Sequence, residues 1–194
     1  MSTEPDLAGL HRARRILVLG SPGVGKTFLS TFLGRHLGLE PIRLDDHFWK
    51  PGPVRLPTNE WRTLVVKLAS RPAWVMDGTY EATLDLRLPA ADALIYVRRS
   101  RWICLWRVVA RRVLSRWQPQ AGSSPGHALT SFFLRYVIRF PTSTEPEVFR
   151  LITELAHGKP LIVLDGARDV ARLLDRLERT TRSAGVPANG RPAA

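Results

Sequence analysis

Ile16-Leu-Val-Leu-Gly-Ser-Pro-Gly-Val-Gly-Lys-Thr-Phe-Leu29 is the stretch that decides the fold. Its first four residues are apolar, and Gly20 to Thr27 follow the pattern G-x-x-x-x-G-K-S/T of a P-loop. An apolar run with helical spacing begins at Phe28. The order of strand, glycine-rich loop and helix turns backbone N–H groups and the positive end of a helix toward a polyphosphate. We therefore predict a nucleoside triphosphate site here.

The residues of this loop have separate predicted roles. Lys26 reaches the β- and γ-phosphates and is a predicted catalytic residue. Thr27 offers its hydroxyl to Mg²⁺, which usually shares its coordination shell with substrate phosphate and water. ATP and Mg²⁺ are therefore the expected cofactors. The predicted nucleotide-binding residues of the loop are Gly20, Ser21, Pro22, Gly23, Val24, Gly25, Lys26, Thr27 and Phe28.

The chain of 194 residues is 44% hydrophobic, enough for one substantial core. We predict one domain over 12–182, with a small mobile lid or insert at about 112–146 and flexible termini at 1–11 and 183–194. No run reaches eighteen uncharged apolar residues, so we expect no membrane partner and a cytoplasmic location. Cys104 is the single cysteine, and it is either part of the core or a reactive thiol.

The balance of 29 Lys and Arg against 17 Asp and Glu gives a formal net charge of +12, which makes polyanions plausible partners. Charge alone does not choose between ATP and nucleic acid. The predominance of arginine suits bidentate phosphate contacts, but GC-rich coding would produce it without a functional cause. No helix-turn-helix or zinc module is visible, so nucleic acid is a possible partner but not the favoured one.

Strand patterns alternate with helix patterns along the chain. This alternation predicts an α/β fold in which a five-stranded parallel sheet is covered by helices on both faces. Residues 50–57 are rich in proline and predict a loop over the site. Thr58 or Asn59 is expected to cap the helix that follows. The predicted strands are 16–19, 41–44, 73–76, 93–97 and 160–164, and the helices are 28–37, 58–68, 102–117, 129–140, 147–157 and 169–181.

From Arg15 to Leu177 the chain resembles the adenylate-kinase-like branch of P-loop kinases. It is most similar to small bacterial proteins called topology modulation (FlaR-like) proteins. The resemblance rests on 44–50 (LDDHFWK), 74–80 (WVMDGTY), 84–88 (LDLRL), 91–95 (ADALI) and 101–107 (RWICLWR).

This resemblance implies roles for three further residues. Asp77 is similar to an aspartate that holds the water shell of Mg²⁺. Arg107 and Arg111 resemble an R-x-x-x-R pair in which the first arginine packs on adenine and the second contacts phosphate. Independently, two arginines one helical turn apart could neutralise a transferring phosphoryl group, although a solvated basic helix face is the alternative.

The chain also departs from adenylate kinases. Thr79-Tyr80-Glu81 stands where they have Phe-Pro-Arg, so a contact to the phosphate of AMP is missing and Arg87 could compensate for it. No arginine lies between Arg116 and Arg135, so Arg135 and Arg139 could supply the lid charge. AMP is therefore a doubtful acceptor.

Two acidic residues follow the second predicted strand and suggest the acceptor site. Asp45-Asp46 resembles the acceptor loop of uridine-kinase-like hydroxyl kinases, in which a carboxylate deprotonates the acceptor. We favour Asp45 as the base because it is nearer the strand end, and an exposed acidic loop is the alternative. The predicted acceptor-binding residues are Asp45, Asp46, Phe48, Trp49, Tyr80 and Arg87.

The combined patterns predict an ATP-dependent phosphotransferase acting on a small molecule that is a nucleoside, a nucleotide or another hydroxyl compound. Its predicted catalytic residues are Lys26, Asp45, Arg107 and Arg111. The alternative is an ATP-binding regulator with weak hydrolysis that associates with nucleic acid.

Overall fold

A computed structural model describes residues 7–50, 54–117 and 130–183. The sheet has five parallel strands, as predicted, and the strand before the P-loop lies at its centre. Its residues Ile16 to Leu19 are completely buried, because both faces of the sheet are covered by helices. The strands lie in the order β2 (Pro41–Arg43), β5 (Trp74–Asp77), β1 (Arg15–Gly20), β6 (Ala93–Arg98) and β7 (Leu161–Asp165).

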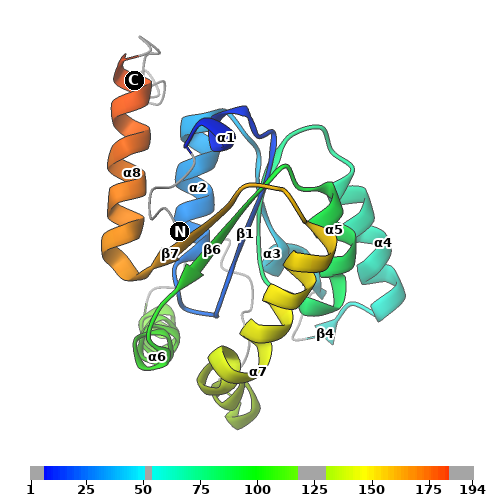
Figure 1. Ribbon diagram of the computed structural model, residues 1–194. Coiled ribbons are helices and arrows are strands. Elements are labelled where there is room, and N and C mark those ends of the chain that lie inside the picture. Colours follow the sequence, from blue (N-terminus) through cyan, green and yellow to red (C-terminus); the bar gives the residue numbers. More distant parts are fainter. Residues whose placement is uncertain (1–6, 51–53, 118–129, 184–194) are drawn as a thin grey trace, which may run out of the picture.

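Helices form a layer on each face of this sheet (Figure 1). The first layer is α1 (Leu7–Arg12), α2 (Lys26–Leu37) and α8 (Gly166–Ser183), and the second is α4 (Thr58–Ala69), α5 (Leu84–Ala90) and α7 (Ser131–Leu155).

The remaining elements lie around the carboxyl ends of the strands. They are α3 (Leu44–Phe48), the antiparallel pair β3 (Trp49–Lys50) and β4 (Val54–Arg55), the 3-10 turn η1 (Glu81–Thr83) and α6 (Arg101–Trp117). Cys104 of α6 is completely buried, as expected of a core residue.

The two helices predicted over 129–140 and 147–157 form the single helix α7, so that prediction is wrong. Pro141 and Pro146 lie inside this helix. The buried stripe continues past both prolines at spacings of three and four residues, and its burial offsets the backbone hydrogen bonds that proline removes. The stripe consists of Phe133, Val137, Phe140, Thr144, Val148 and Ile152.

Two boundary predictions are also corrected. Residues 7–11 are not a loose leader, because α1 forms there and Leu10 is completely buried in the core. Thr58 does not cap α4: it is the first helical residue, and Pro57 precedes it without a side-chain cap. Residues 1–6 and 184–194, and 118–129 of the predicted insert, lie outside the described residues, so their flexibility stays a prediction.

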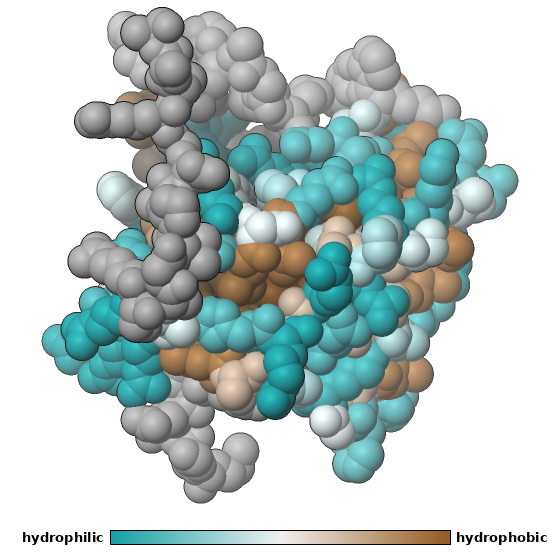
Figure 2. Space-filling model, turned by 90° about the horizontal axis from the view of Figure 1, so that it is seen from above, coloured by the Kyte–Doolittle hydropathy of each residue, from teal (hydrophilic) through white to brown (hydrophobic). Residues whose placement is uncertain are grey.

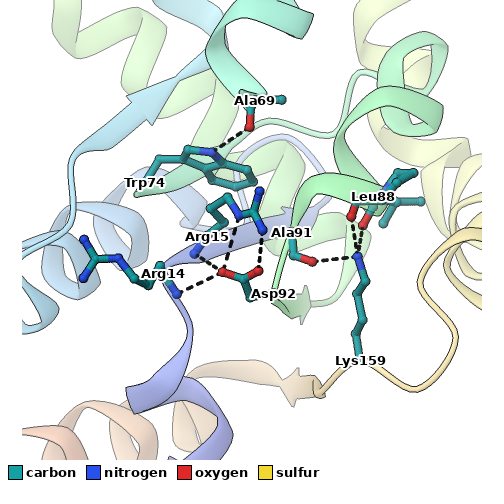
Figure 3. A network of polar contacts seen from close by, with 9 residues as sticks. Arg14, Arg15, Ala69, Trp74, Leu88, Ala91, Asp92 and Lys159 are labelled. Atoms are coloured by element: carbon teal, nitrogen blue, oxygen red, sulfur yellow. Dashed lines mark hydrogen bonds and ion pairs between the residues drawn. The ribbon is translucent and has the colours of Figure 1, made fainter. Parts of the chain in front are cut away.

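The amino ends of the strands carry two groups of polar contacts, one around Asp92 and one around Lys159 (Figure 3). Asp92 accepts hydrogen bonds from the backbone N–H groups of Arg14 and Arg15 and from the guanidinium of Arg15, at 2.9 to 3.5 Å. Lys159 Nζ donates to the carbonyls of Leu88, Pro89 and Ala91 at 2.6 to 2.8 Å, which caps the end of α5. The surface at this end is mainly hydrophilic, with hydrophobic residues gathered in the middle (Figure 2).

Among the described residues, no helix combines the length and the apolar character needed to cross a bilayer. The same residues contain no cluster of three or more His, Cys, Asp or Glu side chains suited to a metal ion.

Candidate active site

The P-loop connects β1 to α2 at the carboxyl edge of the sheet, and α6 crosses close to it. Gly23 and Gly25 have φ angles of 80° and 109°, in the left-handed region that favours glycine. A Cβ atom on Gly23 would lie 2.5 Å from the carbonyl oxygen of Cys104 and 3.0 Å from a methyl carbon of Val108. Glycine is therefore required both for the turn and for the close packing of α6.

Lys26 is the first residue of α2, and its ammonium lies inside the loop. Nζ donates to the carbonyl oxygens of Gly20 at 2.8 Å and Ser21 at 3.0 Å. Burial lowers the pKa of Lys26, while the carboxylates of Asp77 and Asp45 act in the opposite direction. The lysine is thus a poorly solvated cation facing the site.

Asp77 ends β5 and pairs in register with Val18 of β1. Its carboxylate is buried and accepts a hydrogen bond from Ser30 Oγ at 2.6 Å. Burial raises the pKa of Asp77, against the effects of Ser30 and Lys26. Asp77 and Thr27 line one cavity, so the two residues predicted to serve Mg²⁺ are brought together. Hydroxyl and carboxylate oxygens are the donors that this ion prefers.

That cavity has a volume of about 760 Å³ and joins the predicted nucleotide and acceptor residues. Ser21, Val24, Asp46 and Arg87 are not part of its wall. The cavity is lined by Gly20, Pro22, Gly23, Gly25, Lys26, Thr27, Phe28, Asp45, Phe48, Trp49, Arg55, Asp77, Gly78, Thr79, Tyr80, Glu81, Arg107, Arg111, Thr130, Phe132, Phe133 and Tyr136.

Asp45 and Tyr80 form a hydrogen-bonded pair in the wall of the same cavity. Tyr80 Oη donates to a carboxylate oxygen of Asp45 at 2.5 Å. Burial and the neighbouring Asp45 raise the pKa of Tyr80, so the phenol stays a proton donor at neutral pH. Asp45 and Asp46 are both exposed, but only Asp45 belongs to the cavity wall.

An aromatic cluster surrounds this pair. The ring centroid of Phe48 lies 4.9 Å from that of Tyr80, 5.1 Å from that of Trp49 and 5.0 Å from that of Trp61. The Arg55 guanidinium lies 5.8 Å from the centre of the Trp49 ring. Phe48 and Trp49 line the cavity, and the rings of Phe48 and Trp61 pack against the ring of Tyr80.

The backbone of Tyr80 is strained, with a φ of 32° in a residue that is not glycine. Arg87, which is completely buried, fixes this loop from the inside. Its guanidinium donates to the carbonyl of Thr79 and, at 2.7 to 3.3 Å, to those of Gly78, Tyr80 and Thr83. Burial lowers the pKa of Arg87 to about 9, which leaves it protonated at pH 7.

The prediction that Arg87 contacts the acceptor is therefore corrected. The side chain has no exposed surface, and the backbone carbonyls already occupy its donors. An internal arginine satisfies carbonyls of an irregular loop that regular secondary structure leaves without partners.

The sequence analysis did not assign two residues that connect the parts of the site. Thr79 Oγ1 donates to Gly20 O at 2.7 Å and accepts from Gly20 N at 3.2 Å, which joins the β5 loop to the P-loop. Tyr136 Oη donates to Glu81 at 2.7 Å, which joins α7 to the same loop. The position of Thr79 two residues after Asp77 was a usable signal, whereas nothing local in sequence connects Tyr136 with Glu81.

A second cavity of about 380 Å³ lies between the P-loop, α6 and α8. Val24 and Phe28 form part of its wall, together with Arg99 and Ala167. Arg107 lines both cavities, and its Nη1 lies 3.5 Å from the carbonyl oxygen of Val24. The predicted adenine contact of Arg107 therefore has a hollow beside it.

No protein-family model matches the chain, and no curated protein matches it. Solved structures do match the chain. Shikimate kinase from Acinetobacter baumannii in complex with shikimate has a TM-score of 0.57 and 15% identity, covering 89% of this chain and 95% of that chain. Gluconokinase from Sinorhizobium meliloti 1021 has a TM-score of 0.49 and 18% identity, covering 88% and 94%. Deoxyadenosine kinase from M. mycoides with bound dCTP has a TM-score of 0.45 and 13% identity, covering 87% and 98%.

The similarity to shikimate kinase shows the fold, which is that of the P-loop kinases. At these identities a structural likeness carries no substrate from one protein to another. The chemistry of this chain must be argued from its own site.

Proposed function

We propose that this protein transfers the γ-phosphoryl group of ATP to a hydroxyl group of a small acceptor. One observation carries the proposal: a single cavity contains the P-loop with Lys26 and also the hydrogen-bonded pair of Asp45 and Tyr80. The first set of residues suits a nucleoside triphosphate and the second suits a hydroxyl acceptor. A phosphotransferase needs both in one enclosure.

The nucleotide side is built for phosphate. The left-handed glycines leave the loop backbone without side chains that would obstruct an approaching anion, and α2 begins at Lys26. Adenine would lie in the second cavity against Arg107. Thr27 and Asp77 would hold Mg²⁺ or its water ligands. When bound, this ion would neutralise charge on the phosphates.

The acceptor side is built for proton removal. Asp45 would accept the proton of the attacking hydroxyl, with one of its oxygens held by Tyr80 and the other available. Lys26, Arg107 and Arg111 would stabilise the charge that develops on the transferring group. Arg87 acts through the loop, because it holds Tyr80 in the conformation that reaches Asp45.

The composition of the acceptor wall favours a flat acceptor without a phosphate group. Aromatic rings dominate it, and Asp45 and Glu81 add two carboxylates. Among the described lining residues of α3, the β3–β4 pair and the loop after β5, Arg55 is the only cation. A nucleoside fits this wall better than a nucleoside monophosphate, and aminoglycoside-like or sugar hydroxyl compounds are further candidates.

Within the P-loop kinases we propose the adenylate-kinase-like branch, close to the topology modulation proteins, on the basis of the sequence resemblance given above. The position of Arg107 between two cavities supports this placement. The alternative of a nucleotide-binding regulator is less favoured, because a regulator has no use for a carboxylate held beside the phosphate-binding loop.

The test is ADP release from ATP and Mg²⁺ with nucleosides and their own monophosphates as matched pairs, together with sugar and aminoglycoside-like compounds. Lys26→Ala, which lacks the phosphate-binding ammonium, is the blank. We expect ADP formation that depends on a phosphate-free acceptor. A slow rate of ADP formation that no acceptor changes, but that DNA or RNA does change, would support the regulator instead.

A further inference from the structure

Helix α6 has a broad apolar face that points away from the protein. Trp102 and Trp106 are 65% and 69% exposed, and Leu114 is 67% exposed. At 100° per residue, the exposed apolar side chains of this helix cover an arc of about 140°. This exposed apolar face consists of Trp102, Ile103, Trp106, Val109, Val113 and Leu114.

The side of α6 that the protein does bury lies opposite this face. Cys104 and Val108, which are 0% and 4% exposed, pack against the P-loop and the core. Docking onto the domain therefore explains one side of the helix and leaves the other unexplained. The other exposed large hydrophobic residues, Phe28, Val54, Val66, Phe132 and Leu161, belong to separate elements and form no comparable row.

Positive charge accompanies the apolar face. The helix contains no Asp or Glu. Arg107 and Arg111 follow one edge of the apolar arc but line the cavity beside the P-loop. Arg101 and Arg112 lie about 60° to 80° beyond the other edge at 100° per residue. Helix α7 packs against α6 and has no acidic residue before Glu145. An apolar stripe between arginines is the pattern of helices that lie in the interface of a bilayer.

We propose that α6 docks the protein on the surface of an anionic lipid bilayer. Trp102 and Trp106 would lie at the level of the head groups, where tryptophan is favoured, and Val109 and Val113 would enter the acyl boundary. Arg101 and Arg112, which do not line the nucleotide cavity, would attract anionic lipid. This proposal departs from the expectation of no membrane partner, which was drawn from the absence of a spanning segment and did not consider a helix lying on the surface.

Other occupants of the face match the observations less well. A second copy would bring two arginine-rich helices together without an acidic residue on either. Single-stranded nucleic acid could stack on the tryptophans but gains little from Val109, Val113 and Leu114. The adjoining segment 118–129 has Leu129 as its only large aliphatic residue, so its sequence offers little to cover the face.

The experiment is co-sedimentation of the full chain with phosphatidylcholine vesicles, with and without phosphatidylglycerol. The test variant is Trp102→Ser/Trp106→Ser, and the matched control is Val54→Ser/Val66→Ser, which also removes two exposed apolar side chains. We expect binding to the anionic vesicles, weakened about tenfold or more in the tryptophan variant and unchanged in the control. Arg101→Gln/Arg112→Gln should weaken binding and flatten its dependence on salt.

Three results would overturn the proposal. The tryptophan variant could bind anionic vesicles as well as the wild type does. Sedimentation velocity could show a dimer that this variant loses in the absence of lipid, which would assign the face to a second copy. The wild type could fail to bind vesicles but bind single-stranded DNA, with the DNA binding lost in the tryptophan variant. ATP binding and the thermal midpoint, measured on every variant, separate these results from misfolding.

Discussion

The two ends of the sheet hold their charged groups differently, although burial lowers the pKa of one lysine at each end, Lys26 and Lys159. At the carboxyl end, Lys26 and Asp77 are poorly solvated. Burial lowers the pKa of Lys26 and raises the pKa of Asp77, so it favours the neutral form of each side chain. At the amino end, Asp92 receives several hydrogen bonds and Lys159 donates to three carbonyls. At the carboxyl end, the effect of burial on these two pKa values outweighs the effect of the neighbouring charges. This suits a site that binds an anionic ligand together with a metal ion.

The backbone also differs between the ends. Left-handed glycines occur at both ends, including Gly158 beside Lys159, but the strained Tyr80, the only described non-glycine residue with a positive φ, lies at the carboxyl end. Strain persists only where the surroundings enforce it, and here Arg87 does so. The carboxyl end of the sheet is therefore organised for chemistry and the amino end for stability. Four substitutions test this division.

Asp45→Asn should remove catalysis and leave nucleotide binding intact. The amide keeps the shape of the side chain but cannot take a proton, so we expect kcat to fall by about 10² to 10⁴. Acceptor-dependent ADP release measures kcat, and calorimetry with a non-hydrolysable ATP analogue measures binding. Tyr80→Phe keeps the carboxylate and should lose much less. Full kcat in Asp45→Asn would show that the base is elsewhere.

Arg87→Met should destabilise the fold although Arg87 is only a positioning residue of the site. The variant leaves buried carbonyls without donors and releases the Tyr80 loop, so we expect a loss of about 3 to 5 kcal/mol in the free energy of unfolding. Urea unfolding followed by circular dichroism provides the measurement. An unchanged midpoint would contradict the role assigned to these hydrogen bonds.

Lys159→Met should reduce stability without affecting activity. Methionine retains the length of the side chain but leaves three carbonyls at the end of α5 without their donor, at an expected cost of about 1 to 3 kcal/mol. The same urea measurement applies, and kcat in folded protein should match the wild type. A change in kcat at native conditions would break the separation between the two ends.

Asp92→Asn should show a small effect that depends on pH. Although burial opposes it, hydrogen bonds from Arg15 and from the backbone of Arg14 and Arg15 lower the pKa of Asp92. The carboxylate therefore stabilises the fold above its unfolded pKa of about 3.9, and this contribution disappears as the pH falls through the lower folded value. We expect a difference of about 1 kcal/mol at pH 7, reduced because the pair is partly exposed. Thermal unfolding at pH 7 and near pH 3 tests it, and an equal loss at both would contradict the linkage.

Much of the fold could be predicted because its signals are local. The P-loop pattern identified the central strand and the loop, and four further apolar runs identified the other strands of the sheet. The errors arose where tertiary burial overrode a local rule. Two prolines indicated a break in α7, but the buried stripe carries the helix through them. The polar start of the chain indicated a leader, but Leu10 packs into the core.

The same distinction between local sequence signals and tertiary contacts applies to the residues of the candidate site. Lys26, Thr27, Asp77 and Asp45 were identifiable because each follows a strand or belongs to a recognisable loop, and carboxyl ends of parallel strands meet at one edge. Arg87 was misassigned because its sequence position next to the acceptor loop does not tell whether the side chain points outward or inward.

The sequence by itself determined the class of fold, the phosphate loop and the basic, acid-free character of α6. The tertiary structure alone decided that Arg87 is internal, that Thr79 and Tyr136 connect the parts of the site, and that the apolar arc of α6 points away from the domain. The physical reason is the distance along the sequence over which each effect acts. Backbone propensity and motif chemistry act within a few residues, whereas burial and hydrogen-bond partners depend on segments that meet only when the sheet is assembled.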